Sequence, residues 1–176
     1  MKGSLKVPVE IRTPAGADAH VRAFVVGFAS AVKPQTYRKL KFAERRYQQS
    51  VLRWESALGR IRNDPSNAVL RWKLSNDLGT FFHGLERELG LVVTNQRKAL
   101  LRDLTLSKSD LAYTVRLAKR FDIDEIRNSG LPWSRFRELL DLKDEDVMKR
   151  CMQLILAGKI RTTEEIRSFH RKAKVR

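Results

Sequence analysis

The chain has 176 residues, of which 36 are Lys or Arg and 20 are Asp or Glu, and its formal net charge is +16. This length suits one domain or two small ones, and 42% hydrophobic residues provide enough apolar material for a folded core. No apolar run approaches the roughly 20 residues that cross a bilayer. The single cysteine, Cys151, excludes an intramolecular disulfide, and no signal-peptide pattern opens the chain, so we expect a cytoplasmic protein.

The excess of positive charge indicates a polyanionic partner, because basic proteins gain affinity by releasing the counterions condensed on nucleic acid. The excess is concentrated in two segments. Residues 34–62 contain eight basic and two acidic residues, and residues 159–176 contain seven and two. DNA is the favoured ligand and RNA the alternative. A basic protein without a polyanion is a less favoured interpretation, and so is a membrane surface, because the basic segments also carry apolar stripes typical of a core.

The first 33 residues show two patterns. Glycines and prolines surround a short apolar alternation, which is compatible with a strand or an extended arm: Leu5, Val7, Val9, Ile11. Because nothing else in the sequence offers it a partner strand, we interpret residues 1–17 as an arm. From Asp18, apolar residues follow helical spacing, which predicts a helix that ends before Pro34: Val21, Phe24, Val25, Phe28, Val32.

The longest helical pattern follows Pro34. Apolar residues recur every three or four positions over about seven turns: Leu40, Ala43, Tyr47, Val51, Trp54, Leu58, Ile61. Asp64 and Pro65 then predict a cap and the first position of a second helix, which Gly90 ends. That helix has its own seam: Leu70, Leu74, Leu78, Phe81, Leu85, Leu89. The short connection predicts a long antiparallel hairpin within a helical region over residues 18–93.

Residues 94–176 are expected to form a C-terminal bundle of shorter helices. The patterns place them at 94–104, from Ser107 or Ser109 to Phe121, and at 124–128, 132–140, 144–157 and 163–172. Thr162 and Glu165 form a capping-box pair at the start of the last one. Because strands and crossover helices do not alternate, the predicted fold class is all-α.

Patterns typical of catalysis or metal binding are sparse. The chain has three histidines, and none has a second His or a Cys at ligand spacing: His20, His83, His170. We interpret His83 as a packing residue and Cys151 as a buried apolar residue rather than a reactive thiol. There is no glycine-rich phosphate loop, serine-hydrolase motif or metal-nuclease arrangement. We therefore expect no catalytic residue, no metal and no cofactor.

The helix predicted before Phe121 carries basic and hydroxyl side chains on its expected outer side, as phosphate and base-edge contacts require: Lys108, Tyr113, Thr114, Arg116, Lys119, Arg120. An ordinary solvated helix with ion pairs to Asp110 and Asp122 explains the pattern equally well. Trp54 and Trp72 are interpreted as packing residues, with base stacking as the minor alternative.

Several motifs follow one another in this region: Leu106–Leu111, Phe121, the run Leu131-Pro132-Trp133-Ser134-Arg135-Phe136-Arg137-Glu138-Leu139-Leu140, Leu142, Asp144, and Ile160–Ile166. This order resembles the helical N-terminal domain of YhcG-type proteins, over about residues 66–172 and most specifically at 131–140. The resemblance implies a helix-turn-helix-like DNA-binding module, commonly fused to a downstream nuclease. The chain ends where the nuclease would begin, and Arg135 stands where the family usually has histidine, so the resemblance implies binding without cleavage.

Two functional hypotheses follow. The first is a non-catalytic DNA-binding protein, nucleoid-associated, whose C-terminal module contacts phosphates through Lys108, Arg116, Lys119, Arg120, Arg135 and Arg137, aided by Arg167, Arg171, Lys172 and Lys174. The second is a helical structural subunit of a multi-subunit ribonucleoprotein, similar to the small subunits of CRISPR effectors, that tracks a backbone along Arg38, Lys41, Arg45, Arg46 and Arg53. A regulator should prefer duplex and dimerise, whereas a subunit should bind single strands and associate with sibling proteins. A ribosome- or RNA-associated basic protein is a third, weaker hypothesis.

Overall fold

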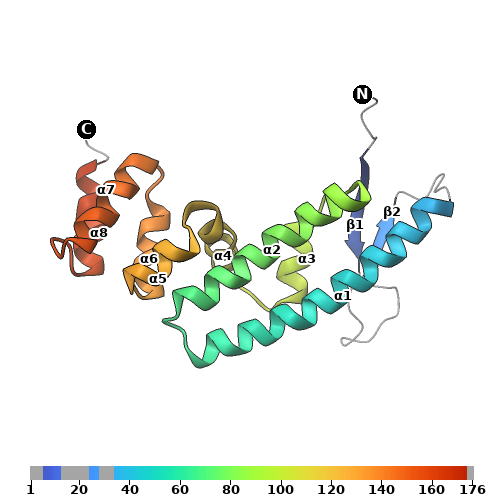
Figure 1. Ribbon diagram of the computed structural model, residues 1–176, viewed down its shortest axis with the longest axis horizontal. Coiled ribbons are helices and arrows are strands. Elements are labelled where there is room, and N and C mark those ends of the chain that lie inside the picture. Colours follow the sequence, from blue (N-terminus) through green and yellow to red (C-terminus); the bar gives the residue numbers. More distant parts are fainter. Residues whose placement is uncertain (1–5, 13–23, 28–33, 174–176) are drawn as a thin grey trace. The chain divides into compact units, whose positions relative to one another are not determined.

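The computed structural model describes residues 6–12, 24–27 and 34–173, which form eight helices and three short strands (Figure 1). Most of these residues are helical, as predicted. The chain divides into two compact units, Met1–Gly59 with Asp77–Leu111 and Arg60–Asn76 with Ala112–Arg176. The boundary that we expected at residue 93 lies inside the first unit, because residues 91–93 pair with the N-terminal segment there.

The N-terminal segment of the first unit is a strand rather than a free arm. Strand β1 (Val7–Arg12) lies in the centre of a three-stranded sheet, antiparallel to β2 (Phe24–Gly27) and parallel to β3 (Leu91–Val93). Val9 and Ile11 are fully buried, as the alternation requires. The parallel partner is about 80 residues away in the chain, which is why local patterns pointed to an arm.

Strand β2 replaces part of the helix that we predicted before Pro34. Residues 24–27 pair with β1, with Val25 opposite Ile11, and the rest of that predicted helix lies outside the described residues. Two adjacent β-branched residues, Val25 and Val26, favour an extended backbone once a partner strand is present. The helical spacing of the apolar residues was therefore misleading here.

The hairpin of the first unit is formed by most of α1 (Pro34–Asn63) and the second half of α2 (Ala68–Leu89), which run antiparallel (Figure 1). The predicted α1 seam is confirmed, since its members in this unit are buried: Leu40, Ala43, Tyr47, Val51, Trp54, Leu58. The Trp54 ring meets Phe81 edge-on, with 5.3 Å between centroids, and Tyr47 contacts both rings. This aromatic cluster fixes which face of α1 points inward.

The first residues of two helices differ from the sequence prediction. Helix α2 begins at Ala68 rather than Pro65, because Asn67 supplies the cap: its Oδ1 accepts a 3.0 Å hydrogen bond from the backbone N–H of Leu70. Helix α3 (Gln96–Asp103) begins after Asn95 rather than at residue 94, and the Asn95 side chain makes no hydrogen bond that caps it. The Asn95 side chain instead clamps β1, accepting from the Ile11 N–H at 2.9 Å and donating to the Ile11 carbonyl at 2.8 Å.

The second unit packs helices around a core that includes Leu117, Phe136, Leu139 and Cys151. Its elements are the first part of α2, most of α4 (Lys108–Arg120), α5 (Ile123–Ser129), α6 (Trp133–Asp141), α7 (Glu145–Leu156) and α8 (Thr163–Ala173). Helices α6, α7 and α8 all contact one another. Trp72 packs against this core as expected, and its Nε1 donates to the Phe121 carbonyl at 2.7 Å.

Helix caps in the second unit agree with the sequence. Thr162 and Glu165 form the predicted capping box, with reciprocal hydrogen bonds of 3.2 and 2.9 Å. Asp144 caps α7 by accepting from the backbone N–H groups of Asp146 and Val147.

None of the helices in the described ranges is both long and apolar enough to span a membrane.

Candidate nucleic-acid interface

The outer side of α1 in the first unit carries a set of exposed cations, which we call the α1 basic face: Arg38, Lys39, Lys41, Arg45, Arg53. The face arises from helix periodicity. The buried seam occupies positions 40, 43, 47, 51, 54 and 58, so positions 38, 41, 45 and 53 turn toward solvent. From Arg38 to Arg53 the face extends along about 22 Å of helix axis.

Carboxylates are nearly absent from this surface. Helix α1 contains only two acidic residues, Glu44 and Glu55, and both are half-buried rather than exposed. Glu44 forms an ion pair with Lys41, in which Nζ lies 3.0 Å from Oε2. Arg38 and Arg45 have no carboxylate partner among the described residues. Lys39 donates to the Leu89 carbonyl at 3.2 Å. A solvated helix normally mixes both signs of charge, so the excess that carboxylates leave unpaired on this face is centred on Arg38 and Arg45.

One edge of the face is tied to α2 by ion pairs. Arg53 donates from Nε and a terminal nitrogen to Asp77, at 2.9 and 3.1 Å, and Asp77 also accepts from Trp54 Nε1 at 3.0 Å. Arg46 is half-buried and pairs with Glu88 at 2.7 Å. These contacts hold α1 and α2 together. Arg46 and Arg53 are therefore less available to a ligand than Arg38 and Arg45.

An open groove of about 400 Å³ lies between α1 and α2 beside the basic face. It shares Arg46 and Arg53 with the ion pairs just described, and it also contains Gln49, His83 and Arg87. We predicted His83 as a packing residue, which was wrong: Phe81 and Phe82 are buried, but the next helical position, His83, is exposed. About 100° of rotation separates neighbouring residues on an α-helix, so the aromatic pair did not determine the direction of the His83 side chain.

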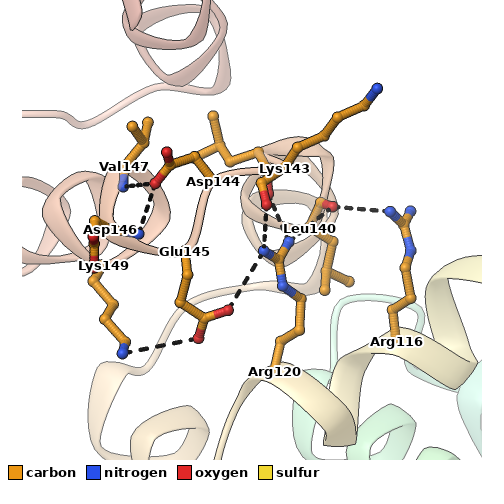
Figure 2. A network of polar contacts seen from close by, with 10 residues as sticks. Arg116, Arg120, Leu140, Lys143, Asp144, Glu145, Asp146, Val147 and Lys149 are labelled. Atoms are coloured by element: carbon orange, nitrogen blue, oxygen red, sulfur yellow. Dashed lines mark hydrogen bonds and ion pairs between the residues drawn. The ribbon is translucent and has the colours of Figure 1, made fainter.

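Arg120, a predicted phosphate contact, instead points into the second unit (Figure 2). Its guanidinium donates to the carbonyls of Leu142 at 2.6 Å, Lys143 at 3.2 Å and Leu140 at 3.4 Å, and lies 3.7 Å from Glu145. Only 17% of the side chain is exposed. Carbonyls at the end of a helix lack intrahelical partners and carry partial negative charge, so this arginine completes the C-terminus of α6.

Arg116 binds the same helix end. It donates to the Leu140 carbonyl at 3.0 Å, and its guanidinium lies 4.8 Å from the centre of the Tyr113 ring (Figure 2 shows the first contact). The Tyr113 hydroxyl donates to Asp141, 2.8 Å away. Thr114, which we placed on the outer side of the helix, is buried. The sequence could not show these roles because the α6 carbonyls come from a segment about 20 residues further along.

The other predicted contacts in the second unit are mixed with acidic residues. Arg137 lies over the Tyr113 ring at 4.9 Å, and Arg135 donates to the Arg161 carbonyl. Arg167 makes a bidentate pair with Glu138, at 3.0 and 2.6 Å, which raises the pKa of the arginine, and Arg171 pairs with Glu164 at 2.8 Å. Lys119 and Lys172 are exposed, as is Lys108 in the first unit, and Lys174 lies outside the described residues.

Reactive groups are held in unreactive surroundings. Cys151 is fully buried, and burial raises the pKa of its thiol to about 11, in agreement with its interpretation as a core residue. No cluster of His, Cys, Asp and Glu suited to a metal ion occurs in the part of the chain that the structure describes.

Comparison with known proteins gives no further guide. No protein-family model, curated protein or solved structure matches the chain, so the resemblance to YhcG-type proteins stays a prediction.

One feature of the interface was missed by sequence reasoning. Phe42 is 52% exposed and lies among the cations of the α1 basic face. A signal was present: Phe42 falls outside the apolar seam, and every residue three or four positions away from it is basic.

Proposed function

We propose that the protein is a non-catalytic nucleic-acid-binding protein that holds the phosphate backbone on the α1 basic face. The observation that carries this proposal is the combination of five exposed cations on one helix side, two of them in ion pairs, with no fully exposed carboxylate on that helix. Such a surface attracts any phosphate chain and reads no base sequence. It suits the backbone-tracking role of a ribonucleoprotein subunit better than the role of a compact repressor.

The C-terminal module is the second candidate. Helices α6, α7 and α8 contact one another pairwise, as the three helices of a helix-turn-helix domain do. Its disadvantage is electrostatic. Glu164 and Glu165 occupy the first turn of α8, and Arg167 and Arg171 are paired with carboxylates, so little free positive charge remains on that helix.

A salt titration gives the first test. Because Lys41 and Arg53 also hold carboxylates, neutralising about three to five phosphates predicts a slope of log affinity against log salt of about −2 to −3.5 on single strands and about −3 to −4.5 on duplex DNA. Affinity for a single strand should then fall about twentyfold to a hundredfold between about 50 and 200 mM salt. A slope near zero would contradict the proposal.

Charge-matched variants locate the interface. Arg38→Glu/Arg45→Glu and Lys108→Glu/Lys119→Glu change the net charge equally, and all four side chains are exposed. In fluorescence-anisotropy titrations the first variant should lose at least about tenfold in affinity, with the slope reduced by about 1.4 to 1.8. The second should stay near the parent protein. The reverse result would transfer phosphate binding from α1 to helix α4.

A further inference from the structure

Phe42 is an exposed aromatic residue surrounded by cations. On a helix, the nearest surface neighbours of a residue are those three and four positions away, and for Phe42 these are Arg38, Lys39, Arg45 and Arg46. The Arg46 guanidinium lies over the Phe42 ring, 5.6 Å from its centre. About half of the residue, 52%, is exposed to solvent.

Phe42 is not part of the core that the described residues form. The aromatic cluster of the first unit consists of Tyr47, Trp54, Phe81 and Phe82, and Phe42 makes no ring contact with any described residue of that cluster. Three large apolar residues are exposed in the described part of the chain, and Phe42 is the aromatic one. Exposing it costs hydrophobic free energy that burial would recover.

We infer that Phe42 stacks on a nucleobase, so that the α1 basic face selects single-stranded over duplex nucleic acid. This inference rests on the proposed function. An aromatic ring offers one face to a base while neighbouring cations hold the phosphates on either side, which is how sequence-independent single-strand binding operates. In a duplex the bases are already stacked on one another, and a side chain on an open helix face does not reach them.

A protein partner fits this surface less well. Docking of an amphipathic helix needs a continuous apolar stripe with anchors about one turn apart. Among the α1 residues whose burial the structure describes, the other large exposed apolar residue is Leu52, ten positions from Phe42 and therefore about 15 Å along the axis. The isolated ring among cations matches a nucleotide, which has one base for each phosphate.

Leu52 provides a matched control. It is 61% exposed on the same helix, but the residues three and four positions away are Gln48, Gln49, Glu55 and Ser56, none of them basic. Leu52→Ala removes a similar exposed apolar side chain from surroundings that would not hold phosphates.

The experiment compares Phe42→Ala, Phe42→Leu, Phe42→Trp and Leu52→Ala in anisotropy titrations with a labelled single strand and a duplex of equal length. Phe42→Ala should weaken single-strand binding about five- to 150-fold with an unchanged salt slope and unchanged duplex binding. Phe42→Leu should weaken it similarly because the π-face is lost. Phe42→Trp and Leu52→Ala should bind like the parent protein. In Phe42→Trp, the single strand should also quench the fluorescence of the new indole.

Other outcomes overturn the inference. Full affinity in Phe42→Leu, or an equal loss in Leu52→Ala, would mean that only apolar contact matters. An equal loss on duplex would remove the strand selectivity. If sedimentation shows that Phe42→Ala converts a dimer into a monomer, the ring is a contact between copies. A parent protein that binds no nucleic acid defeats the proposed function itself, whereas binding sensitive to Arg38→Glu/Arg45→Glu but not to Phe42 defeats the inference alone.

Discussion

Replacing Arg120 separates a structural arginine from a phosphate-binding one. Arg120→Met keeps most of the aliphatic stem and removes the guanidinium. In the protein this group binds three backbone carbonyls at the end of α6, with the shortest contact, 2.6 Å, to Leu142. We therefore expect the substitution to lower the stability of the second unit and to leave nucleic-acid affinity unchanged.

The magnitude follows from these contacts. Hydrogen bonds to charged groups contribute about 1.5–3 kcal/mol each, and a cation at a helix C-terminus adds about 0.3–1 kcal/mol. Two of the three Arg120 contacts exceed 3.0 Å, and carbonyls near the surface regain water after the substitution. We therefore expect Arg120→Met to lower the free energy of unfolding by about 2–3 kcal/mol.

The assay is urea unfolding followed by tryptophan fluorescence, with Lys119→Met as the control. Lys119 is the adjacent basic residue and is exposed, so its substitution should change the free energy of unfolding by less than about 0.5 kcal/mol. With a denaturant dependence of about 2 kcal/mol per M, Arg120→Met should lower the midpoint by about 1 M or more. Unchanged stability together with weakened nucleic-acid binding would refute the structural role.

Three further predictions concern buried or capping groups. Burial raises the pKa of Tyr47 above its ordinary 10.0, and so does the Asp103 carboxylate, which accepts the tyrosine's hydrogen bond at 2.7 Å. The stability that the protonated hydroxyl contributes is therefore complete below pH 10 and is lost as the pH rises further. In urea titrations the free energy of unfolding of Tyr47→Phe should be lower than that of the parent protein by about 1 kcal/mol at pH 8 and should fall less steeply above pH 10. The Cys151 thiol, whose pKa burial raises to about 11, should react with a thiol reagent at pH 8 only after urea unfolds the chain, and rapid reaction of the folded protein would contradict its burial. Asp144→Ala should lower the free energy of unfolding by about 0.5–2 kcal/mol, measured by the same urea assay, because two backbone N–H groups at the start of α7 lose their acceptor.

Local features of the fold were readable from the sequence because they depend on residues that are close in the chain. The α1 seam through Tyr47 and Trp54 and the capping box of Thr162 and Glu165 all follow helical spacing, and the structure confirms them. The sheet was not readable. Strands β1 and β3 pair although the whole α1–α2 hairpin lies between them in the sequence. The hydrogen bonds between the Asn95 side chain and the Ile11 backbone join residues 84 positions apart.

The candidate site shows the same division. The charge of α1 and its outward direction follow from periodicity, so Arg38 and Arg45 were correctly expected to be exposed. The roles of Arg116 and Arg120 depend on where the end of α6 lies, which no local pattern encodes. Phe42 was overlooked because an apolar residue next to a seam is ordinarily assigned to the core.

The most direct test of the central claim is an NMR titration that follows backbone amide shifts as a short single-stranded oligonucleotide is added. If the α1 basic face holds the strand, the largest shifts fall between Arg38 and Arg53, and those in α6, α7 and α8 stay small. Shifts concentrated at α4 and α8, around Lys119 and Arg171, with α1 unaffected, would contradict it and assign binding to the C-terminal module.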